Sequence, residues 1–101
     1  MIKFLILDKN ERLNINKNTE TVEEIIKKLN EEHKELIEAL EQGTDIDHII
    51  EEALDGIQVK ANLVDRYSNK NMSLEKQINL HNMKLIGRGW EFKKEFEIKQ
   101  I

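Results

Sequence analysis

The feature that most constrains the fold of this chain is the absence of proline from its 101 residues, which include only four glycines. Both residue types interrupt helices, because proline lacks a backbone N–H and glycine loses the most conformational entropy on ordering. Apolar residues recur at three- and four-residue steps over much of the sequence, which is the period of an amphipathic helix. The sequence therefore predicts an all-α (mainly α) fold built from long helices.

Two long helices are predicted, over about residues 21–42 and 45–68. The first opens with the capping box Thr21-Val22-Glu23-Glu24 and stops at Gly43, and Asp45 is the expected cap of the second. Because the Gly43-Thr44 linker is short, the two helices should be antiparallel neighbours. Their apolar stripes consist of Val22, Ile25, Ile26, Leu29, His33, Leu36, Ile37 and Leu40 in the first helix, and of Ile46, Ile50, Ala53, Leu54, Ile57, Ala61 and Val64 in the second.

The remaining segments are shorter and less regular. A third helix is predicted from a Ser73 cap to Gly87-Arg88-Gly89. The alternation in residues 2–7 favours a short strand buried on both faces, and the Asn-rich residues 10–18 indicate a loop. The tail, residues 90–101, fits either a strand or a fourth helix. We therefore expect one domain over residues 1–101, in which residues 1–20 are an unassigned strand or loop and short β segments are compatible with the termini.

Composition excludes several classes of function. The chain has no cysteine, which rules out disulfides, thiol nucleophiles and cysteine-type zinc sites. No apolar run approaches the ~18–20 residues needed to span a bilayer, and the start lacks the cleavage site of a signal peptide, so we expect a cytoplasmic protein without a membrane partner. Residues 21–58 carry three basic and twelve acidic side chains, a net charge of −9, which argues against nucleic-acid binding and invites a cation.

Two pairs of carboxylates stand out within this acidic region. Glu32 and Glu35 are spaced i, i+3 on the first predicted helix, and Glu52 and Asp55 have the same spacing on the second. Residues three apart share a helix face, and like charges at this spacing destabilise an isolated helix. Two such pairs on neighbouring helices predict a site for a hard cation, because Mg²⁺ and Mn²⁺ prefer oxygen ligands.

The second helix has apolar residues on two opposite sides. At about 100° per residue, Ile50 and the rest of the apolar stripe lie on one side, whereas Glu52, Asp55, Val59 and Leu63 lie on the other. A purely solvated face would not combine Val59 and Leu63 with two carboxylates. This pattern is typical of a central helix that is covered on both sides and borders a partly enclosed site, or of one that contacts another subunit.

The order and spacing of these residues resemble a known family. Glu31-Glu32-His33-Lys34-Glu35, a spacer of sixteen residues, and Glu52-Ala53-Leu54-Asp55 resemble the signature of the MazG-like, all-α NTP pyrophosphohydrolases. That signature is a doubled glutamate within EExxE on one helix, followed by ExxD on the next. The segment from His81 to Trp90 is similar to the basic and aromatic tail of small MazG-like proteins, so the resemblance covers residues 21 to about 90.

The resemblance implies a function and a set of site residues. The activity would be Mg²⁺-dependent hydrolysis of a nucleoside triphosphate, or its deoxy form, to the monophosphate and pyrophosphate, in house-cleaning or nucleotide-pool control, with Mn²⁺ as an alternative metal. Glu32, Glu35, Glu52 and Asp55 would be the metal ligands, and Glu31 would orient or deprotonate the attacking water. Together these five are the candidate catalytic residues. The competing interpretation is a non-catalytic helical interaction module whose acidic pairs are simply solvated.

Four further residues are candidates for substrate binding. Asn62 lies two turns beyond Asp55 on the same face, and Lys84 and Arg88 are spaced i, i+4, so that both could reach a triphosphate. Trp90 could stack on a base. The alternatives are that Lys84 and Arg88 only complement the dipole at the end of the third helix, and that Trp90 is a core anchor.

Self-association is the remaining expectation. The first helix can cover only one side of the second, which leaves Val59 and Leu63 in need of a partner. A homodimer, or a tetramer built as a dimer of dimers, would complete the bundle, and the MazG-like resemblance points the same way. The alternative is that residues 1–8 and 90–101 fold back and cover that side within one chain.

Overall fold

The computed structural model describes residues 4–43, 45–68 and 73–97, and helices make up most of this part of the chain. The prediction of a mainly helical fold is confirmed. The chain divides into two compact units, Met1–Tyr67 and Ser68–Ile101, which we describe separately. The prediction of a single domain over 1–101 stays a prediction. The interpretations that involve Ile2, Thr44, residues 69–72 and residues 98–101 lie outside the described part.

Helix α1 spans Val22–Gln42 and begins and ends as its sequence predicts. The Thr21 side-chain oxygen accepts a hydrogen bond of 3.1 Å from the Glu24 backbone N–H, which satisfies one of the free amides of the first turn. At the other end Gly43 takes a left-handed conformation with φ 63°, and its N–H bonds to the Ala39 carbonyl. This is the helix-ending conformation that glycine adopts without steric cost.

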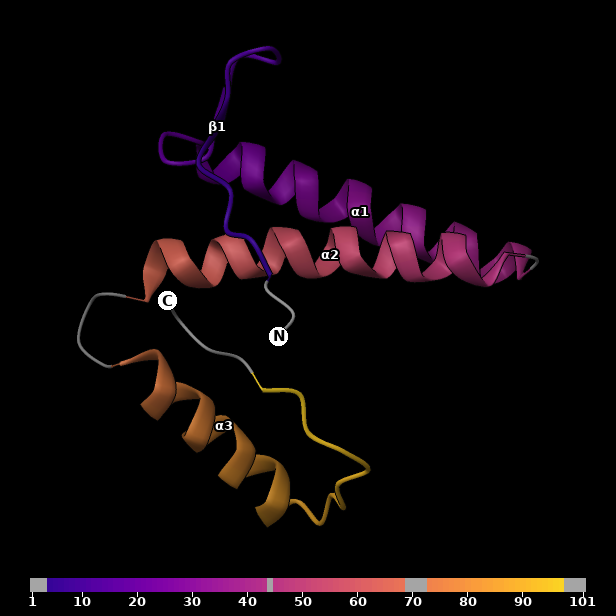
Figure 1. Cartoon of the computed structure of the whole chain (residues 1–101), viewed down its shortest axis with the longest axis vertical. Coiled ribbons are helices and arrows are strands. Elements are labelled where there is room, and N and C mark those ends of the chain that lie inside the picture. The colour runs from indigo at the N-terminus through magenta and orange to yellow at the C-terminus, as the bar shows by residue number, and fades with distance from the viewer. Residues whose placement is uncertain (1–3, 44, 69–72, 98–101) are drawn as a thin grey trace. The chain divides into compact units, whose positions relative to one another are not determined.

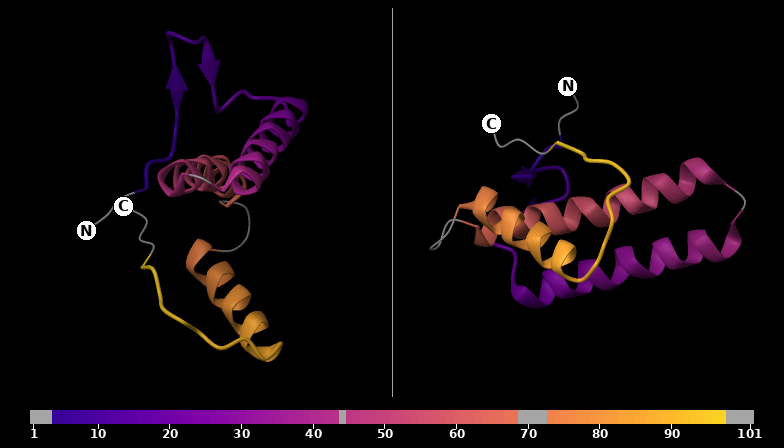
Figure 2. Two further views of the ribbon diagram at one scale, coloured as in Figure 1. Left: turned by 90° about the vertical axis from the view of Figure 1, so that its right-hand side faces the viewer. Right: turned by 90° about the horizontal axis from the view of Figure 1, so that it is seen from below.

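Helix α2 spans Ile46–Tyr67, and the Asp45 carboxylate caps it by accepting a hydrogen bond of 3.2 Å from the His48 N–H. Figures 1 and 2 show α1 and α2 lying side by side and antiparallel. The predicted pair of long antiparallel helices is therefore confirmed, with bounds that differ by one residue at the most. Across the described residues, no helix combines the length and the apolar character required to cross a membrane.

The second unit contains helix α3, which spans Leu74–Gly87. Its cap is Ser73, as predicted, whose hydroxyl accepts a hydrogen bond of 3.2 Å from the Lys76 N–H. The chain leaves the helix through Arg88 and through Gly89, which has φ 89°. Residues 90–97 form neither a strand nor a fourth helix, so the tail predicted to adopt one of the two adopts neither within the described residues.

The prediction of a strand near the N-terminus is wrong for its described residues. Phe4, Leu5, Ile6 and Leu7 are exposed and have no regular secondary structure. The backbone of this segment bonds to side chains of α2 instead of to a second strand: the Leu7 N–H donates to the Asn62 Oδ1 at 3.1 Å, and the Gln58 amide donates to the Leu5 carbonyl at 2.7 Å. Because these backbone groups bond to a helix, the segment pairs with no neighbouring strand among the described residues, in spite of its alternating pattern.

The only strands among the described residues form a small hairpin within the region predicted as a loop. Strand β1 (Lys9–Asn10) pairs antiparallel with strand β2 (Ile15–Asn16), as the left view of Figure 2 shows. Asn14, in the turn, has φ 53°, a left-handed conformation that asparagine tolerates better than most residues. All four strand residues are exposed, so the hairpin adds no core, and the Asn-rich sequence is consistent with its turn.

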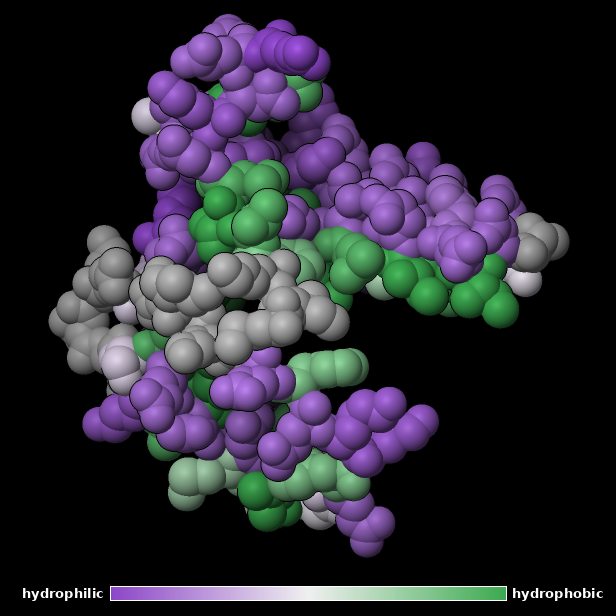
Figure 3. All heavy atoms as spheres, viewed as in Figure 1, coloured by the Kyte–Doolittle hydropathy of each residue, from purple (hydrophilic) through white to green (hydrophobic). Residues whose placement is uncertain are grey.

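The side of α2 that faces α1 is the opposite of the one expected. Glu52, Gly56, Val59 and Leu63 are half-buried on the α1 side, where α1 contributes the buried Ile25, Glu32 and Ala39. The large side chains of the apolar stripe are instead exposed, with Ile46 at 73%, Ile50 at 52% and Ile57 at 50%. Figure 3 shows hydrophobic residues gathered along α2, below the polar surface of α1. Val59 and Leu63 therefore do not need a second subunit to cover them.

Candidate metal centre

The α1–α2 interface brings three carboxylates together in its middle. Glu32 comes from α1 and Glu52 and Asp55 from α2, and each offers one oxygen that lies within 4.8 Å of the others. The i, i+3 spacing of Glu52 and Asp55 places both on the α1-facing side, and the antiparallel arrangement aligns Glu32 with them. Three of the four residues predicted as metal ligands are therefore assembled by the fold from two helices.

Glu32 is the buried member of this cluster. It is only 6% exposed, which is rare for a glutamate without full pairing. One oxygen, Oε1, contacts the Lys28 Nζ at 2.8 Å, while Oε2 is buried without a hydrogen-bond partner. The Oε2 of Glu52 is likewise buried without a hydrogen-bond partner, and the Glu52 side chain is 13% exposed. Two buried carboxylate oxygens without donors, on two members of one acidic cluster, match the ligand type of a divalent cation.

The electrostatics of Glu52 show how crowded the cluster is. Burial raises the pKa of Glu52 above its ordinary value of 4.5, and the neighbouring carboxyl group of Glu35 and the charge of Asp55 raise it further. His48, whose Nδ1 lies 4.0 Å from Glu52 Oε1, acts in the opposite direction. A carboxyl group in such surroundings holds its proton more tightly, and a metal ion would relieve the same repulsion.

Glu35 lies at the margin of the cluster. It is exposed on α1, and its carboxyl group reaches that of Glu52 without belonging to the three-oxygen set. Among the four predicted ligands, only Glu32, Glu52 and Asp55 converge directly.

Glu31 is not brought to the cluster. It is exposed and lines a depression formed entirely by α1, together with Ile26 and Lys27. The reason is angular, because adjacent helical residues point about 100° apart, so the burial of Glu32 directs Glu31 to another face. Its role as the residue that activates water therefore rests on the family resemblance alone.

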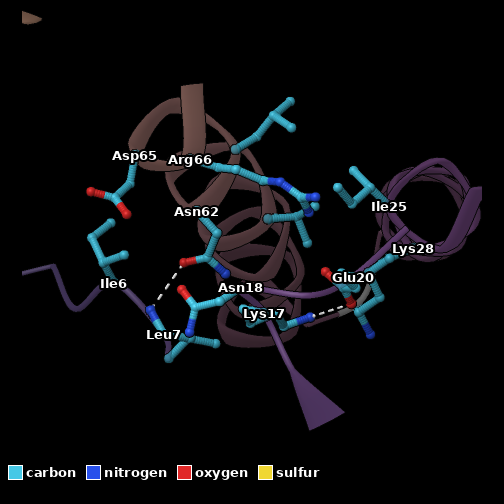
Figure 4. A pocket seen from close by; sticks show the side chains of 12 residues that line it. Ile6, Leu7, Lys17, Asn18, Glu20, Ile25, Lys28, Asn62, Asp65 and Arg66 are labelled. Carbon is cyan, nitrogen blue, oxygen red and sulfur yellow. Dashed lines mark hydrogen bonds and ion pairs between the residues drawn. The ribbon is translucent and has the colours of Figure 1, made fainter. Parts of the chain in front are cut away.

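Asn62 lines a pocket of about 320 Å³ beside the acidic cluster. The pocket is formed by α1, α2 and the N-terminal segment, and Figure 4 shows the hydrogen bond from the Leu7 N–H to the Asn62 side chain at its edge. The same Oδ1 accepts a hydrogen bond of 3.0 Å from the Gln58 amide. Asn62 thus holds the N-terminal segment in place, and its position in the pocket is compatible with the predicted contact to a ligand.

The other predicted substrate-binding residues belong to the second unit. Lys84 lies in the last turn of α3, and Arg88 is the residue at which that helix ends. Trp90 is 68% exposed. The acidic cluster belongs to the first unit. The role of these three residues in binding substrate stays a prediction.

Sequence reasoning missed two neighbours of the cluster, Lys28 and His48. Each lies four residues before a cluster glutamate, Lys28 before Glu32 and His48 before Glu52. The i, i+4 spacing is visible in the sequence, but it is also the commonest spacing of ordinary surface ion pairs. Only the burial of the two glutamates distinguishes these pairs from the pair of Lys34 and Glu38, which is exposed on the outside of α1.

Comparison of the chain with protein-family models, curated proteins and solved structures finds no match. The site offers hard oxygen ligands on a rigid pair of helices, next to a pocket large enough for part of a small molecule, which is the arrangement expected where a divalent cation positions an anionic ligand.

Proposed function

We propose that this chain is a Mg²⁺-dependent nucleoside triphosphate pyrophosphohydrolase, which cleaves a nucleoside triphosphate or its deoxy form to the monophosphate and pyrophosphate. The observation that carries the proposal is the convergence of Glu32, Glu52 and Asp55, with two buried carboxylate oxygens that lack partners. The MazG-like order of EExxE and ExxD supports the substrate class. Mn²⁺ is the alternative metal, and house-cleaning or control of the nucleotide pool is the biological role that the resemblance implies.

The chemistry needs positioning and neutralisation of charge more than covalent catalysis. A bound Mg²⁺ would neutralise phosphate oxygens and lower the pKa of a coordinated water. Glu32, Glu52 and Asp55 would hold it, and Glu35 would complete the set. By resemblance, Glu31 would accept a proton from the water, after a change of side-chain conformation or of helix position that brings it to the substrate.

The deciding experiment is a phosphorus NMR assay of the purified protein with a panel of nucleoside and deoxynucleoside triphosphates and Mg²⁺. We expect monophosphate and pyrophosphate in equal amounts, and no turnover when EDTA replaces the metal. Release of orthophosphate and a diphosphate would mean that the bond cleaved is the wrong one. Absence of turnover over the whole panel with both Mg²⁺ and Mn²⁺ would refute the proposal.

The proposal includes self-association as a homodimer or as a tetramer made of two dimers. Its support is the exposed stripe on α2, which includes Ile46, Ile50 and Ile57, because large contiguous apolar surfaces of monomers are usually interaction sites. The contact surface is thus the side opposite to Val59 and Leu63. Two copies that bury this stripe against each other would form the isologous interface typical of twofold dimers.

The same stripe also favours the second candidate, a non-catalytic helical module that binds another protein through α2. The two candidates differ in what they require of the acidic cluster. An interaction module needs neither metal nor turnover, so the NMR assay separates them without reference to the oligomeric state.

A further inference from the structure

Lys28 occupies a boundary position on α1. Its Nζ lies 2.8 Å from Glu32 Oε1, and its side chain is 44% exposed whereas that of Glu32 is 8% exposed. The hydrogen bond to Glu32 raises the pKa of Lys28 above its ordinary value of 10.5, against the opposing effect of burial, with further contributions from the charges of Glu32, Glu31 and Glu35. Lys28 is therefore a full positive charge at the edge of the acidic cluster.

Lys28 also lines the 320 Å³ pocket, on the side of α1 that continues from the cluster. Two other basic residues line the same pocket, Lys17 and Arg66, and two acidic residues, Glu20 and Asp65, line it as well. Lys17 is paired with Glu20 at 3.0 Å. The pocket begins at Val59, about one helical turn beyond Asp55. Lys28 thus stands between the acidic cluster, where it contacts Glu32, and a pocket that contains further basic side chains.

A divalent cation in the cluster would change the position of Lys28. Glu32 Oε2 is buried without a partner and is the oxygen available to a metal, while the ammonium group contacts Oε1 of the same carboxylate. Two cations on one carboxylate repel each other at this range. The lysine stem is flexible, so its ammonium group can turn away from Glu32 into the pocket.

We propose that Lys28 is a substrate-binding residue that alternates between two partners: it holds Glu32 while the metal is absent, and it contacts the polyphosphate once the metal has bound. The inference rests on the proposed function for its ligand class, an inorganic or nucleotide polyphosphate. In this proposal Lys28, on α1, is a cationic side chain that contacts the polyphosphate. Its role does not depend on Lys84 and Arg88. The proposal predicts opposite effects of one substitution on metal binding and on anion binding.

The test compares Lys28→Met with the wild type in two titrations. In the first, Mn²⁺ alone is titrated and free Mn²⁺ is measured by electron paramagnetic resonance. We expect about two- to fivefold tighter binding by Lys28→Met, because a competing, partly exposed ion pair worth up to ~1 kcal/mol is gone. In the second, the Mg²⁺ complex of inorganic tripolyphosphate is titrated calorimetrically at saturating Mg²⁺. We expect about tenfold weaker binding, because a charge-assisted hydrogen bond is lost.

Lys34→Met is the matched control, since Lys34 forms an i, i+4 pair with Glu38 on the same helix but 78% exposed and away from the cluster. Lys34→Met should leave both titrations unchanged. Lys28→Arg, which keeps the positive charge, should bind tripolyphosphate more tightly than Lys28→Met does. Parallel losses in both titrations, or no change in either, would overturn the role of Lys28. If the wild type binds metal and releases pyrophosphate while Lys28→Met behaves like it, only this inference fails. If the wild type binds no Mn²⁺, the inference and the proposed function fail together.

Discussion

The two sides of α2 have opposite character and opposite exposure. The side toward α1 carries Glu52 and Asp55 and is half-buried, whereas the other side carries Ile50 and Ile57 and is exposed. Burial alone would favour the reverse arrangement. Removing apolar side chains from water stabilises the folded chain, whereas removing unpaired carboxylates from water destabilises it. This arrangement is unfavourable for the metal-free chain, and it agrees with the proposed cation site.

This inversion gives each side a different expected role. The inward side collects groups that a cation would stabilise, and the outward side offers an apolar surface that a second copy would cover. Substitutions on the two sides should therefore have separable effects: those on the inward side should change metal response and turnover, and those on the outward side should change association. Four predictions follow this division, from the largest effect to the smallest.

The largest effect is expected for Glu52→Gln. It removes a charge from the proposed ligand set while keeping the shape of the side chain, and we expect turnover to fall by about 100-fold or more, because a bound metal supplies several kcal/mol to the transition state. We also expect Mg²⁺ to raise the melting temperature of the wild type, because a bound cation stabilises the folded state, and to leave that of Glu52→Gln unchanged. Glu51→Gln is the matched control, because Glu51 is the exposed neighbour on α2. Equal metal responses of the two variants would contradict the assignment of the inward side.

A substitution on the outward side should act on association instead. Ile50 is 52% exposed, so Ile50→Lys places a charge in the apolar stripe without entering the α1 interface. We expect light scattering to show a shift from the dimer or tetramer to the monomer mass of 12.0 kDa. Leu63→Lys, on the inward side, should lower the melting temperature instead. A wild type that is active and monomeric at micromolar concentration would contradict the proposed interface.

The inward side also contains Gly56, one turn after Glu52. A Cβ at this position would meet no atom within 4 Å. Gly56→Ala should therefore stabilise the protein by about 0.5–1 kcal/mol, because alanine loses less entropy in a helix. Gly43→Ala should do the opposite, by about 1–2 kcal/mol, because φ at Gly43 is 63°. Denaturant unfolding measures both, and a destabilised Gly56→Ala would mean that α1 and α2 pack more closely there.

The smallest effect concerns pH in the absence of metal. The pKa of Glu52 is raised in the folded chain above its ordinary value of 4.5, so between these two values the folded state binds more protons than the unfolded state. The contribution of this group to stability is therefore present below pH 4.5 and is lost as pH rises through the raised pKa. Melting temperatures in EDTA should show this fall in the wild type and a smaller one in Glu52→Gln. Equal slopes would contradict it.

Much of the local structure could be predicted from the sequence, because it depends on neighbours in the chain. Thr21, Asp45 and Ser73 cap their helices as predicted, since a capping side chain bonds to an amide only a few residues away. Gly43 ends α1 for an equally local reason. The strand prediction for residues 2–7 failed because a strand requires a partner, and periodicity does not show whether that partner exists.

The candidate site was predictable in part. Glu32, Glu52 and Asp55 follow from their spacing and from two neighbouring helices. Glu31 lies on another face of α1, and Glu35 lies at the margin of the cluster. Both positions depend on how α1 is rotated about its own axis, which the sequence does not show. Lys28 was missed because its i, i+4 pairing with Glu32 has the same appearance in the sequence as the solvated pair of Lys34 and Glu38.

The sequence by itself determined the helices, their ends and the residue types that a hard cation would need, because propensity, capping and i, i+3 spacing are properties of one helix. Only the tertiary structure decided which side of α2 meets α1. Both sides carry apolar residues, so periodicity leaves two packings open. The choice between them depends on how two helical surfaces fit, which buries Glu32 and leaves Ile46 and Ile50 exposed.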